Sequence, residues 1–596
     1  MIPSTGSRSE VKDPETWEDY HDLRKCPPKD LEPPLYVFED LDEQSEFPKK
    51  DSDVTGDILS KLEFTRSNKK PELPPLPPLR TFRDDLKELE EKCVKATGPK
   101  NFPFAEVFDA YYSRSMKLHA VRQTNLYHKQ FVDALKAANK PIPKRAKDFV
   151  PLTISEYDRY CATILLLALV APGYSYQDCW RTGVRFSQVV ADACPVARFE
   201  AINKYLHFAD NQHNDGTRNY KMKYMLEEFR RNLLTVHGPL SPDLSFDEFV
   251  SICMSKCKFS VFMPLKRHPR GIRFYPVVDA KRLTINLYLD TLEKLPSRHP
   301  EFGSIDNLTV HCLTPFLDKG YRVTLDQGFG NPTLLSWLHG RKTPACATMR
   351  GDRKGMPEQL KWSKTEYKLN KSNTKWVKDK KTSIKKPIDF MDAYQSGDLS
   401  VLKWQCKADR SLNFGTTIDN VELDSYSIKR KFEGKWGTIK VPKPKCIADY
   451  YNSCMAGIDL VDQANAFVGV KMRFNRWPSR VNAVLLSTAV ANTRALFMHY
   501  CPNASKKSQS SPRVQEAIVV EKLGHINEAE EKHRLVRLDA KDDTVPMVRD
   551  TKKHRCWVPG CRVKSLAYCP ACLKKKTRWT FCIEHFDKTH NVTMRL

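Results

Sequence analysis

One stretch decides the fold class of this chain: residues 321–338, which read YRVTLDQGFGNPTLLSWL. Its first part, Tyr321 to Leu325, is rich in β-branched and aromatic residues and ends at Asp326, which is typical of a strand followed by a turn. Apolar residues with helical spacing follow from Thr333 to Leu338. A strand that leads directly into a helix predicts α/β architecture for this part of the chain.

The residues before this stretch divide into a helical part and a strand-rich part. Phe104, Val107, Phe108 and Tyr111 recur at i, i+3, i+4 and i+7, which predicts a helix. Ala162 to Ala171 and Phe199 to Leu206 predict further helices in the same part. Short apolar or alternating runs then predict two strands, at Phe274 to Asp279 and Arg282 to Leu289, and a helical pattern returns at Ser479 to Tyr500.

Changes in composition predict the domain boundaries. An acidic, Pro-rich arm without enough apolar residues to order itself precedes the helical part, and a Cys-rich module ends the chain. The predicted parts are a disordered arm (1–100), a helical domain (101–240), the first part of an α/β core (241–345), a basic inserted domain (346–440), the second part of the core (441–505), a linker (506–549) and a zinc-binding module (550–596).

The charge of the chain predicts a polyanionic partner. The formal net charge is +26, yet residues 1–60 carry 16 acids and 7 bases, so the remainder is strongly basic. A basic body behind an acidic arm suits a nucleic-acid binder. An ordinary surface with solvated lysines is the alternative that charge alone leaves open.

The sequence also predicts a compartment. Residues 1–10 are polar and do not form a secretory signal, and the longest apolar run, Ala162 to Ala171, is too short to cross a bilayer. The 18 cysteines then indicate reduced thiols or metal ligands. We expect an intracellular protein without a membrane partner, and a nucleic-acid partner predicts the nucleus.

Three aspartates lie at predicted strand ends or turns: Asp247, Asp326 and Asp459, with Asp462 close to the third. Phosphodiester chemistry uses such carboxylates, because two divalent ions about 4 Å apart activate a nucleophile and stabilise the leaving oxygen, and hard Mg²⁺ prefers carboxylate oxygens. Each aspartate taken singly is more readily explained as a turn former or helix cap.

Colinear sequence blocks around these aspartates resemble those of the piggyBac transposase family. A block upstream in the helical part is similar as well, and the order of the blocks matches the family from about residue 104 to the C-terminal module. The blocks are Arg198–Glu200 and Leu206–Asn211, Ser245–Glu248 with Met263–Phe274, Leu325–Phe329 with Ala347–Pro357, and Tyr450–Asn452 with Ala456–Gln463 and Asn475–Pro478.

The resemblance implies a specific fold and activity. It implies an RNase H-like core in which Asp247, Asp326 and Asp459 bind Mg²⁺ or Mn²⁺ as the catalytic triad, with Asp462 as a nearby fourth acid. It further implies a helical DNA-binding and dimerisation domain, an inserted domain, and a homodimer acting on double-stranded DNA. In that family the enzyme cuts at terminal inverted repeats, forms hairpinned ends and joins them to TTAA targets.

One block departs from the family. After Asp326 the family usually has Asn, an aromatic pair and a small hydroxyl residue, whereas this chain reads Gln327 to Pro332, with two glycines and a proline. Gly and Pro there predict a differently shaped turn. Three functions therefore stay open: an active transposase, a domesticated DNA-binding descendant that does not cleave, and a chromatin or protein-interaction factor that acts through its tail.

The C-terminal module has the spacing of a zinc site. Tetrahedral Zn²⁺ takes thiolate and imidazole ligands from tight turns, and a module this small needs a metal to fold. Two ions need eight ligands, and His554 is the available eighth. The family has a similar PHD- or RING-type module that contacts DNA. The seven principal predicted ligands are Cys556, Cys561, Cys569, Cys572, Cys582, His585 and His590.

The basic insert between the second and third aspartates is a second candidate DNA surface. Residues 353–386 carry 11 lysines and one arginine against three acids, with Trp362, Tyr367 and Trp376 interleaved. Lysines can contact phosphates and aromatic rings can stack on bases, although most such runs are solvated faces.

Overall fold

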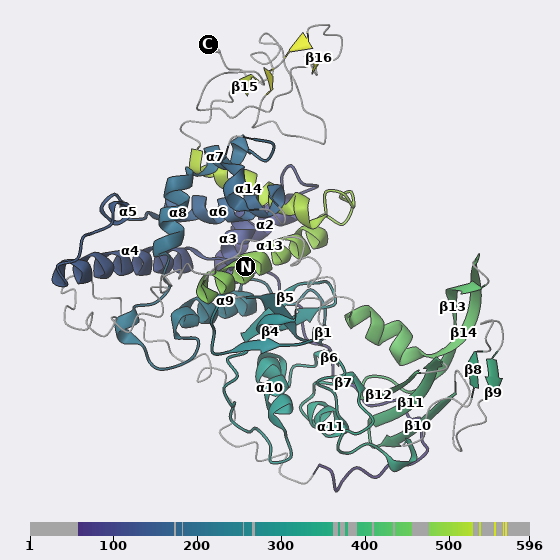
Figure 1. Ribbon diagram of the computed structural model, residues 1–596. Helices are drawn as coiled ribbons and strands as arrows, with labels where there is room; N and C mark the ends of the chain where they lie inside the picture. Colours follow the sequence, from purple (N-terminus) through teal and green to yellow (C-terminus); the bar gives the residue numbers. More distant parts are fainter. Residues whose placement is uncertain are drawn as a thin grey trace, which may run out of the picture.

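The computed structural model describes residues 58–568 with internal gaps (Figure 1). The gaps are residues 172–174, 182, 254, 265–268, 361–366, 370–375, 379–389, 408–409, 433–434, 456–475, 528–535, 538–553, 556–563 and 566.

The described helices gather in one half of the molecule, above the sheet in Figure 1, while α10 and α11 lie below it. Their amphipathic patterns explain the packing, because Phe104, Val107, Phe108 and Tyr111 of the predicted first helix are all buried. The helices are α2 (Lys87–Lys95), α3 (Phe104–Tyr111), α4 (Arg114–Ala137), α5 (Lys144–Lys147), α6 (Ile154–Val170), α7 (Gln188–Ala193), α8 (Val196–Tyr205), α9 (Lys223–Thr235), α10 (Ser304–Leu313), α11 (Pro332–Gly340), α13 (Trp477–Tyr500) and α14 (Ser511–Asn527).

A mixed sheet of ten strands forms the other half. Strands β5, β4 and β1 pair antiparallel in that order, and β6 and β7 then continue the sheet parallel to β1. The strands are β1 (Asp243–Phe246), β2 (Phe249–Ile252), β3 (Ser260–Phe262), β4 (Arg270–Asp279), β5 (Thr284–Leu289), β6 (Arg322–Leu325), β7 (Ala345–Met349), β10 (Met391–Ser396), β11 (Leu399–Lys407) and β12 (Arg410–Thr416).

Among the described residues, four two-stranded pairs lie outside this sheet. The longest is the hairpin of β13 (Leu423–Phe432) and β14 (Lys435–Pro444), which projects at the right of Figure 1. The others pair β8 (Tyr367–Leu369) with β9 (Trp376–Lys378), β15 (Val536–Arg537) with β18 (Ala567–Tyr568), and β16 (His554–Arg555) with β17 (Lys564–Ser565).

The apolar helix α13 joins the two halves. The helix is long and apolar enough to cross a membrane, judged by length and composition alone. However, 89% of its most apolar 18-residue segment is buried inside the protein, which is the pattern of a core helix. Phe497 packs against Phe102 and Phe104 at ring-centroid distances of 5.1 and 5.0 Å, and Asn492 Oδ1 accepts the backbone N–H of Thr284 in β5 at 2.9 Å.

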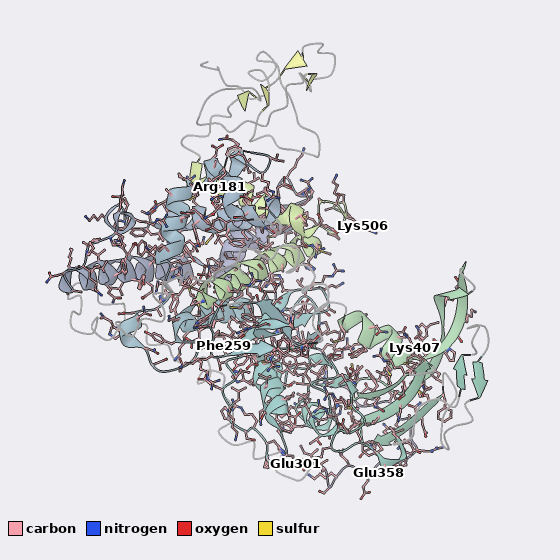
Figure 2. The ribbon with its side chains drawn as sticks, in the orientation of Figure 1. Arg181, Phe259, Glu301, Glu358, Lys407 and Lys506 are labelled. Atoms are coloured by element: carbon pink, nitrogen blue, oxygen red, sulfur yellow. The ribbon has the colours of Figure 1, made fainter. Side chains whose placement is uncertain are left out.

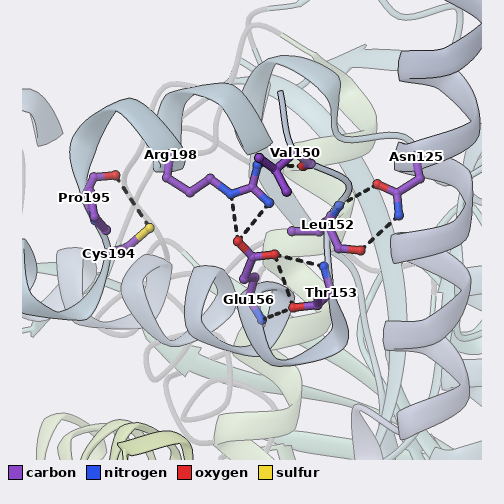
Figure 3. Close-up of polar contacts among 8 residues, drawn as sticks. All are labelled: Asn125, Val150, Leu152, Thr153, Glu156, Cys194, Pro195 and Arg198. Atoms are coloured by element: carbon purple, nitrogen blue, oxygen red, sulfur yellow. Dashed lines mark hydrogen bonds and ion pairs between the residues drawn. The ribbon is translucent and has the colours of Figure 1, made fainter. Parts of the chain in front are cut away.

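Arg198, from the upstream sequence block, has a structural role between α8 and α6 (Figure 3). Its guanidinium binds the Glu156 carboxylate, with Nε 2.9 Å from Oε1, and donates to the Val150 carbonyl at 2.8 Å. Glu156 also completes a capping box with Thr153 at the start of α6. Arg198 therefore fixes α8 on the N-terminus of α6.

The predicted disordered arm is wrong for residues 58–100. The backbone N–H groups of Ile58 and Leu59 donate to the carboxylate of Glu301 at 3.1 and 3.3 Å (Figure 2 labels Glu301). Further along, Thr65 pairs with Gln395 in β10, and Phe82 pairs with His237. The Pro-rich segment builds no core of its own, and its backbone is instead satisfied by distant parts of the body.

Two other predicted boundaries also differ from the structure. The inserted strands β10 to β12 extend the main sheet, because the edge of β7 pairs antiparallel with β12 (Cys346 opposite Thr416). The predicted linker begins with helix α14, whose Gln515 side chain donates to the Leu165 carbonyl at 2.6 Å. Paired polar residues on the buried face of α14 weaken its apolar pattern and conceal the helix in the sequence.

Candidate functional site

Two of the predicted aspartates meet at one edge of the sheet. β1 and β6 are parallel, with Phe246 opposite Leu325, so Asp247 and Asp326 follow at the same ends of adjacent strands. Neighbouring strands lie about 4.8 Å apart, which places the two carboxylates on one short edge. The register between two segments 79 residues apart in sequence brings them together.

Two hydroxyl groups contact Asp326. Thr348, in the neighbouring parallel strand β7, lies with Oγ1 3.4 Å from Asp326 Oδ1, and the Tyr451 hydroxyl lies 3.4 Å from the same oxygen. The two hydroxyls are 3.2 Å apart. Tyr451 belongs to η9 (Cys446–Tyr451), a short π-helix, a conformation that is frequent at functional sites.

The electrostatics of this edge favour a positively charged ligand. Burial raises the pKa of Asp247, and the negative charges of Glu248 and Asp326 raise it as well, together to about 8. The backbone N–H of Glu248 donates to Asp247 Oδ1 at 2.7 Å, which only partly offsets this effect. Two carboxylates that repel each other in a partly buried site fit a divalent cation, because hard cations prefer carboxylate oxygens.

The described residues supply only part of a metal site. Within the described ranges, no group of three or more His, Cys, Asp or Glu side chains is arranged to hold an ion. Asp459 and Asp462 lie in residues 456–475, outside the described part of the chain. Of the four predicted acidic residues, the structure therefore brings Asp247 and Asp326 together and does not describe the other two.

The turn that departs from the family's pattern is well formed. The N–H groups of Phe329 and Gly330 donate to the Asp326 carbonyl at 2.9 and 3.2 Å. Asn331 then caps α11, its side chain accepting the Leu334 N–H at 2.9 Å, and Pro332 occupies the first turn of the helix. The unusual residues thus close a turn and begin a helix directly behind Asp326.

Gly330 is required in this turn by a close approach to β7. A Cβ atom at this position would lie 2.3 Å from Ala347 Cβ and 2.8 Å from the Thr348 carbonyl oxygen. Phe329 packs below the site, with ring centroids 4.8 Å from Phe246 and 5.9 Å from Tyr275. The strand ends that carry the two aspartates therefore share one packed aromatic cluster.

Sequence reasoning missed several contributors to this site. Glu248 and Tyr451 belong to the sequence blocks that resemble the family, but the sequence alone singles out neither as a site residue. Thr348 lies one residue beyond Ala347, which pairs with Leu325. The signal that could have found Thr348 is the polar residue near the end of an apolar strand-like run.

The remaining predicted ligands lie outside the described residues. The seven predicted zinc ligands are among them: Cys556, Cys561, Cys569, Cys572, Cys582, His585 and His590. Of the candidate eighth ligand, His554, only the backbone is described, in β16. The basic insert is described only as the short strands β8 and β9 between residues 361 and 389.

Comparisons with known proteins agree with the sequence blocks. The family model of Transposase IS4 matches residues 105–493. PiggyBac transposable element-derived protein 2 of Homo sapiens is 22% identical over 385 residues, which cover 62% of this chain. The match spans 60% of the length of that human relative.

A solved structure is similar in fold. The cryo-EM structure of a piggyBac transposase synaptic complex with hairpin DNA superposes with a TM-score of 0.58 at 16% sequence identity, over 76% of this chain and 85% of that one. At this identity the likeness concerns the fold, a large mixed sheet with helices. Since the family match extends over more than half of the chain, this chain belongs to the Transposase IS4 family as a piggyBac-type member.

Proposed function

We propose that this chain cleaves and joins DNA strands at the ends of a mobile element, with Mg²⁺ or Mn²⁺ as the cofactor. The observation that carries the proposal is the meeting of Asp247 and Asp326 at the ends of adjacent parallel strands. Asp459 is the proposed third ligand and Asp462 the nearby fourth acid. The antiparallel strands β5, β4 and β1 followed by the parallel β6 and β7 support an RNase H-like core.

The chemistry of the site follows from its own side chains. A bound divalent ion supplies activation of a hydroxyl nucleophile and stabilisation of the leaving oxygen. Asp247 and Asp326 would hold and orient that ion. Thr348 and Tyr451 restrict Asp326, because both hydroxyls contact its Oδ1 and leave Oδ2 for a ligand. Because burial and the neighbouring carboxylates raise the pKa of Asp247, a cation held there would stabilise the charged form of this carboxyl.

The partner of this site is proposed to be double-stranded DNA. The similar solved structure is a transposase complex with hairpin DNA, and this likeness supports DNA as the partner here. Hairpinned ends, TTAA targets and a homodimer are parts of the proposal that rest on the resemblance of the sequence blocks. The net charge of +26 supports a polyanionic substrate. Zinc binding by the C-terminal module and a nuclear location remain parts of the same proposal.

Cleavage of duplex DNA carrying the native genomic flanks of the coding sequence tests the activity. Asp247→Asn and Asp326→Asn each remove one ligand charge, so we expect cleavage to fall at least a hundredfold while DNA affinity changes less than twofold. Asp133→Asn, on the exposed surface of α4, removes the same charge and should cleave normally. Full activity of either site variant would remove that aspartate from the proposed site.

The same assay separates the alternative function. If the unchanged protein binds the flanking DNA specifically but cleaves nothing with Mg²⁺ or Mn²⁺, the chain is a domesticated DNA-binding descendant. The departure after Asp326 does not favour that outcome, because its glycines, Asn331 and Pro332 form a closed turn and a capped helix.

A further inference from the structure

Residues 71–80 form a proline-rich segment that the proposed chemistry does not use. They read PELPPLPPLR and belong to no helix or strand. Proline fixes its own φ at about −65° and disfavours the helical conformation in the residue before it. Together these constraints favour the polyproline II conformation, an extended left-handed helix with about three residues per turn.

One edge of this proline segment packs on the body. Pro71 and Pro77 are buried and Pro74 is half-buried, so the residues that face the protein are spaced three positions apart. Residues with that spacing share one edge of a polyproline II helix, so the burial pattern matches this conformation. Gly320 allows the close approach, because a Cβ atom there would overlap the Pro75 carbonyl oxygen.

The other two edges of the proline segment are apolar and open to solvent. Leu73, Leu76 and Leu79 form one of them, with exposed fractions of 36%, 54% and 51%. Pro75 and Pro78 form the other and are also exposed. A soluble protein gains nothing by itself from a row of exposed leucines, and a continuous exposed apolar surface of this kind marks an interaction site.

Hydrogen bonds from the body fix both ends of the proline segment. The backbone N–H of Glu72 donates to Asp398 Oδ1 at 3.1 Å. At the other end, the backbone N–H of Gly238 donates to the Thr81 carbonyl at 3.2 Å. A ligand that is already held in its bound conformation loses little conformational entropy on binding. The body therefore presents the two apolar edges in a preorganised form.

A positive charge stands at the C-terminal end of the exposed edges. Arg80 is exposed, and its side chain forms no ion pair within the described ranges. Burial lowers the pKa of Lys319, and the charge of Arg80 lowers it further, so these two cations are close enough to repel each other. The nearby Asp318 is paired with Arg341. A partner with an acidic group at this end would relieve the repulsion.

We propose that the proline segment binds a domain of a partner protein that recognises polyproline II helices. Such domains, of which SH3 and WW domains are examples, present a groove lined by aromatic side chains. The exposed leucines and prolines would lie in that groove, and Arg80 would pair with an acidic group beside it. Nucleic acid suits this surface less, because one arginine is the only cation among residues 71–80. The inference is independent of the proposed function.

Surface plasmon resonance with the full chain immobilised, and a panel of purified SH3, WW and EVH1 domains as analytes, tests the proposal. We expect at least one domain to bind. Leu76→Ala should weaken that binding about tenfold, because it removes apolar surface from the contact. Arg80→Gln should also weaken it about tenfold through the loss of a charged hydrogen bond, and Arg80→Lys should weaken it less.

Matched controls come from exposed positions elsewhere on the chain. Val520→Ala removes methyl groups from a side chain of α14 that is 63% exposed, and Arg181→Gln removes an exposed guanidinium (Figure 2 labels Arg181). Both should bind the domain like the unchanged protein. All variants should keep the melting temperature of the unchanged protein, since the altered side chains face solvent.

A synthetic peptide of residues 69–82 measures the effect of preorganisation. The full chain should bind the domain more tightly than the peptide, because the body already orders the segment. In NMR spectra of the isotope-labelled domain, the signals of its groove residues should shift with the unchanged chain and not with the Leu76→Ala/Arg80→Gln double variant.

Four results would overturn the proposal. The first is a lack of binding by every domain of the panel. The second is equal binding by the segment variants and their controls. The third is binding of the peptide but not of the full chain, which would mean that the body blocks the segment. The fourth is a loss of affinity for duplex DNA in Leu76→Ala and Arg80→Gln with domain binding unchanged, which would assign the surface to nucleic acid. Failure of the chain to cleave DNA would overturn only the proposed function.

Discussion

Lys522 of α14 is the most informative position for testing how the C-terminal helix is held on the body. Its ammonium group lies 2.7 and 3.0 Å from the two carboxylate oxygens of Asp109 and 2.9 Å from Asp158 Oδ1. Lys117 contacts the same two carboxylates at 2.9 and 2.8 Å. Two lysines and two aspartates therefore balance their charges where α3, α4, α6 and α14 meet.

Lys522→Met leaves two carboxylates with one lysine in this network. The side chains of Lys522 and Lys117 are 3% and 4% exposed, whereas Asp158 is 18% and Asp109 37% exposed. Breaking a buried ion pair costs about 3–5 kcal/mol. Because water reaches Asp109, we expect the lower end of that range, a loss of about 3 kcal/mol in the free energy of unfolding of the helical half.

Urea denaturation followed by far-UV circular dichroism measures this loss. The double variant Lys522→Met/Asp109→Asn restores the charge balance and should recover more than half of the stability. Lys506→Met, at an exposed lysine labelled in Figure 2, is the control. If Lys522→Met unfolds at the same urea concentration as Lys506→Met, then α14 is not held by this network and the reasoning is wrong.

The stability difference between the unchanged protein and Lys522→Met should decrease as the pH falls. Burial by itself would raise the pKa of Asp158, but the charges of Lys522 and Lys117 outweigh it and the net pKa is lowered from 3.8. A carboxyl with a lowered pKa stabilises the folded state above its unfolded value and loses that contribution as pH falls through the folded value. The difference between the unchanged protein and Lys522→Met should therefore be full at pH 7 and shrink below pH 4.

Two further predictions follow from the site and the tail. Gly330→Ala should lower the free energy of unfolding by about 2 kcal/mol through overpacking, and it should impair cleavage by displacing Asp326. Gly328→Ala is the control, because a Cβ at that position meets nothing within 4 Å, and it should behave like the unchanged protein. Equal melting temperatures for the two variants would contradict the close packing at Gly330. Metal analysis of the purified full chain should find at least one Zn²⁺ per molecule, reduced by Cys572→Ala, and a value well below one would rule out the predicted zinc module.

The sequence alone predicts the elements whose patterns are strong and local. The spacing of Phe104 to Tyr111 gives α3, and the run Tyr321 to Leu325 gives β6 with Asp326 at its end. The predicted helix at Ser479 to Tyr500 is α13. In each case one face or one whole segment is apolar, and burial of that surface is enough to specify the element.

Weak local patterns explain the elements that the sequence did not predict. The buried face of α14 includes Gln515 and Lys522, which are polar in the sequence but have partners in the structure. Residues 58–83 have the composition of a disordered arm, yet several of their backbone groups bond to distant segments, such as Thr65 to Gln395 and Arg83 to Val236. Both features depend on groups hundreds of residues away.

The candidate site shows the same division. Sequence blocks single out Asp247 and Asp326, and their residue types suit a divalent cation. Only the parallel pairing of β1 with β6 places them together, and only the pairing of β6 with β7 and the position of η9 bring Thr348 and Tyr451 to Asp326. Residue type and periodicity are properties of the local chain, whereas strand register arises from contacts between distant segments, which no single window of sequence contains.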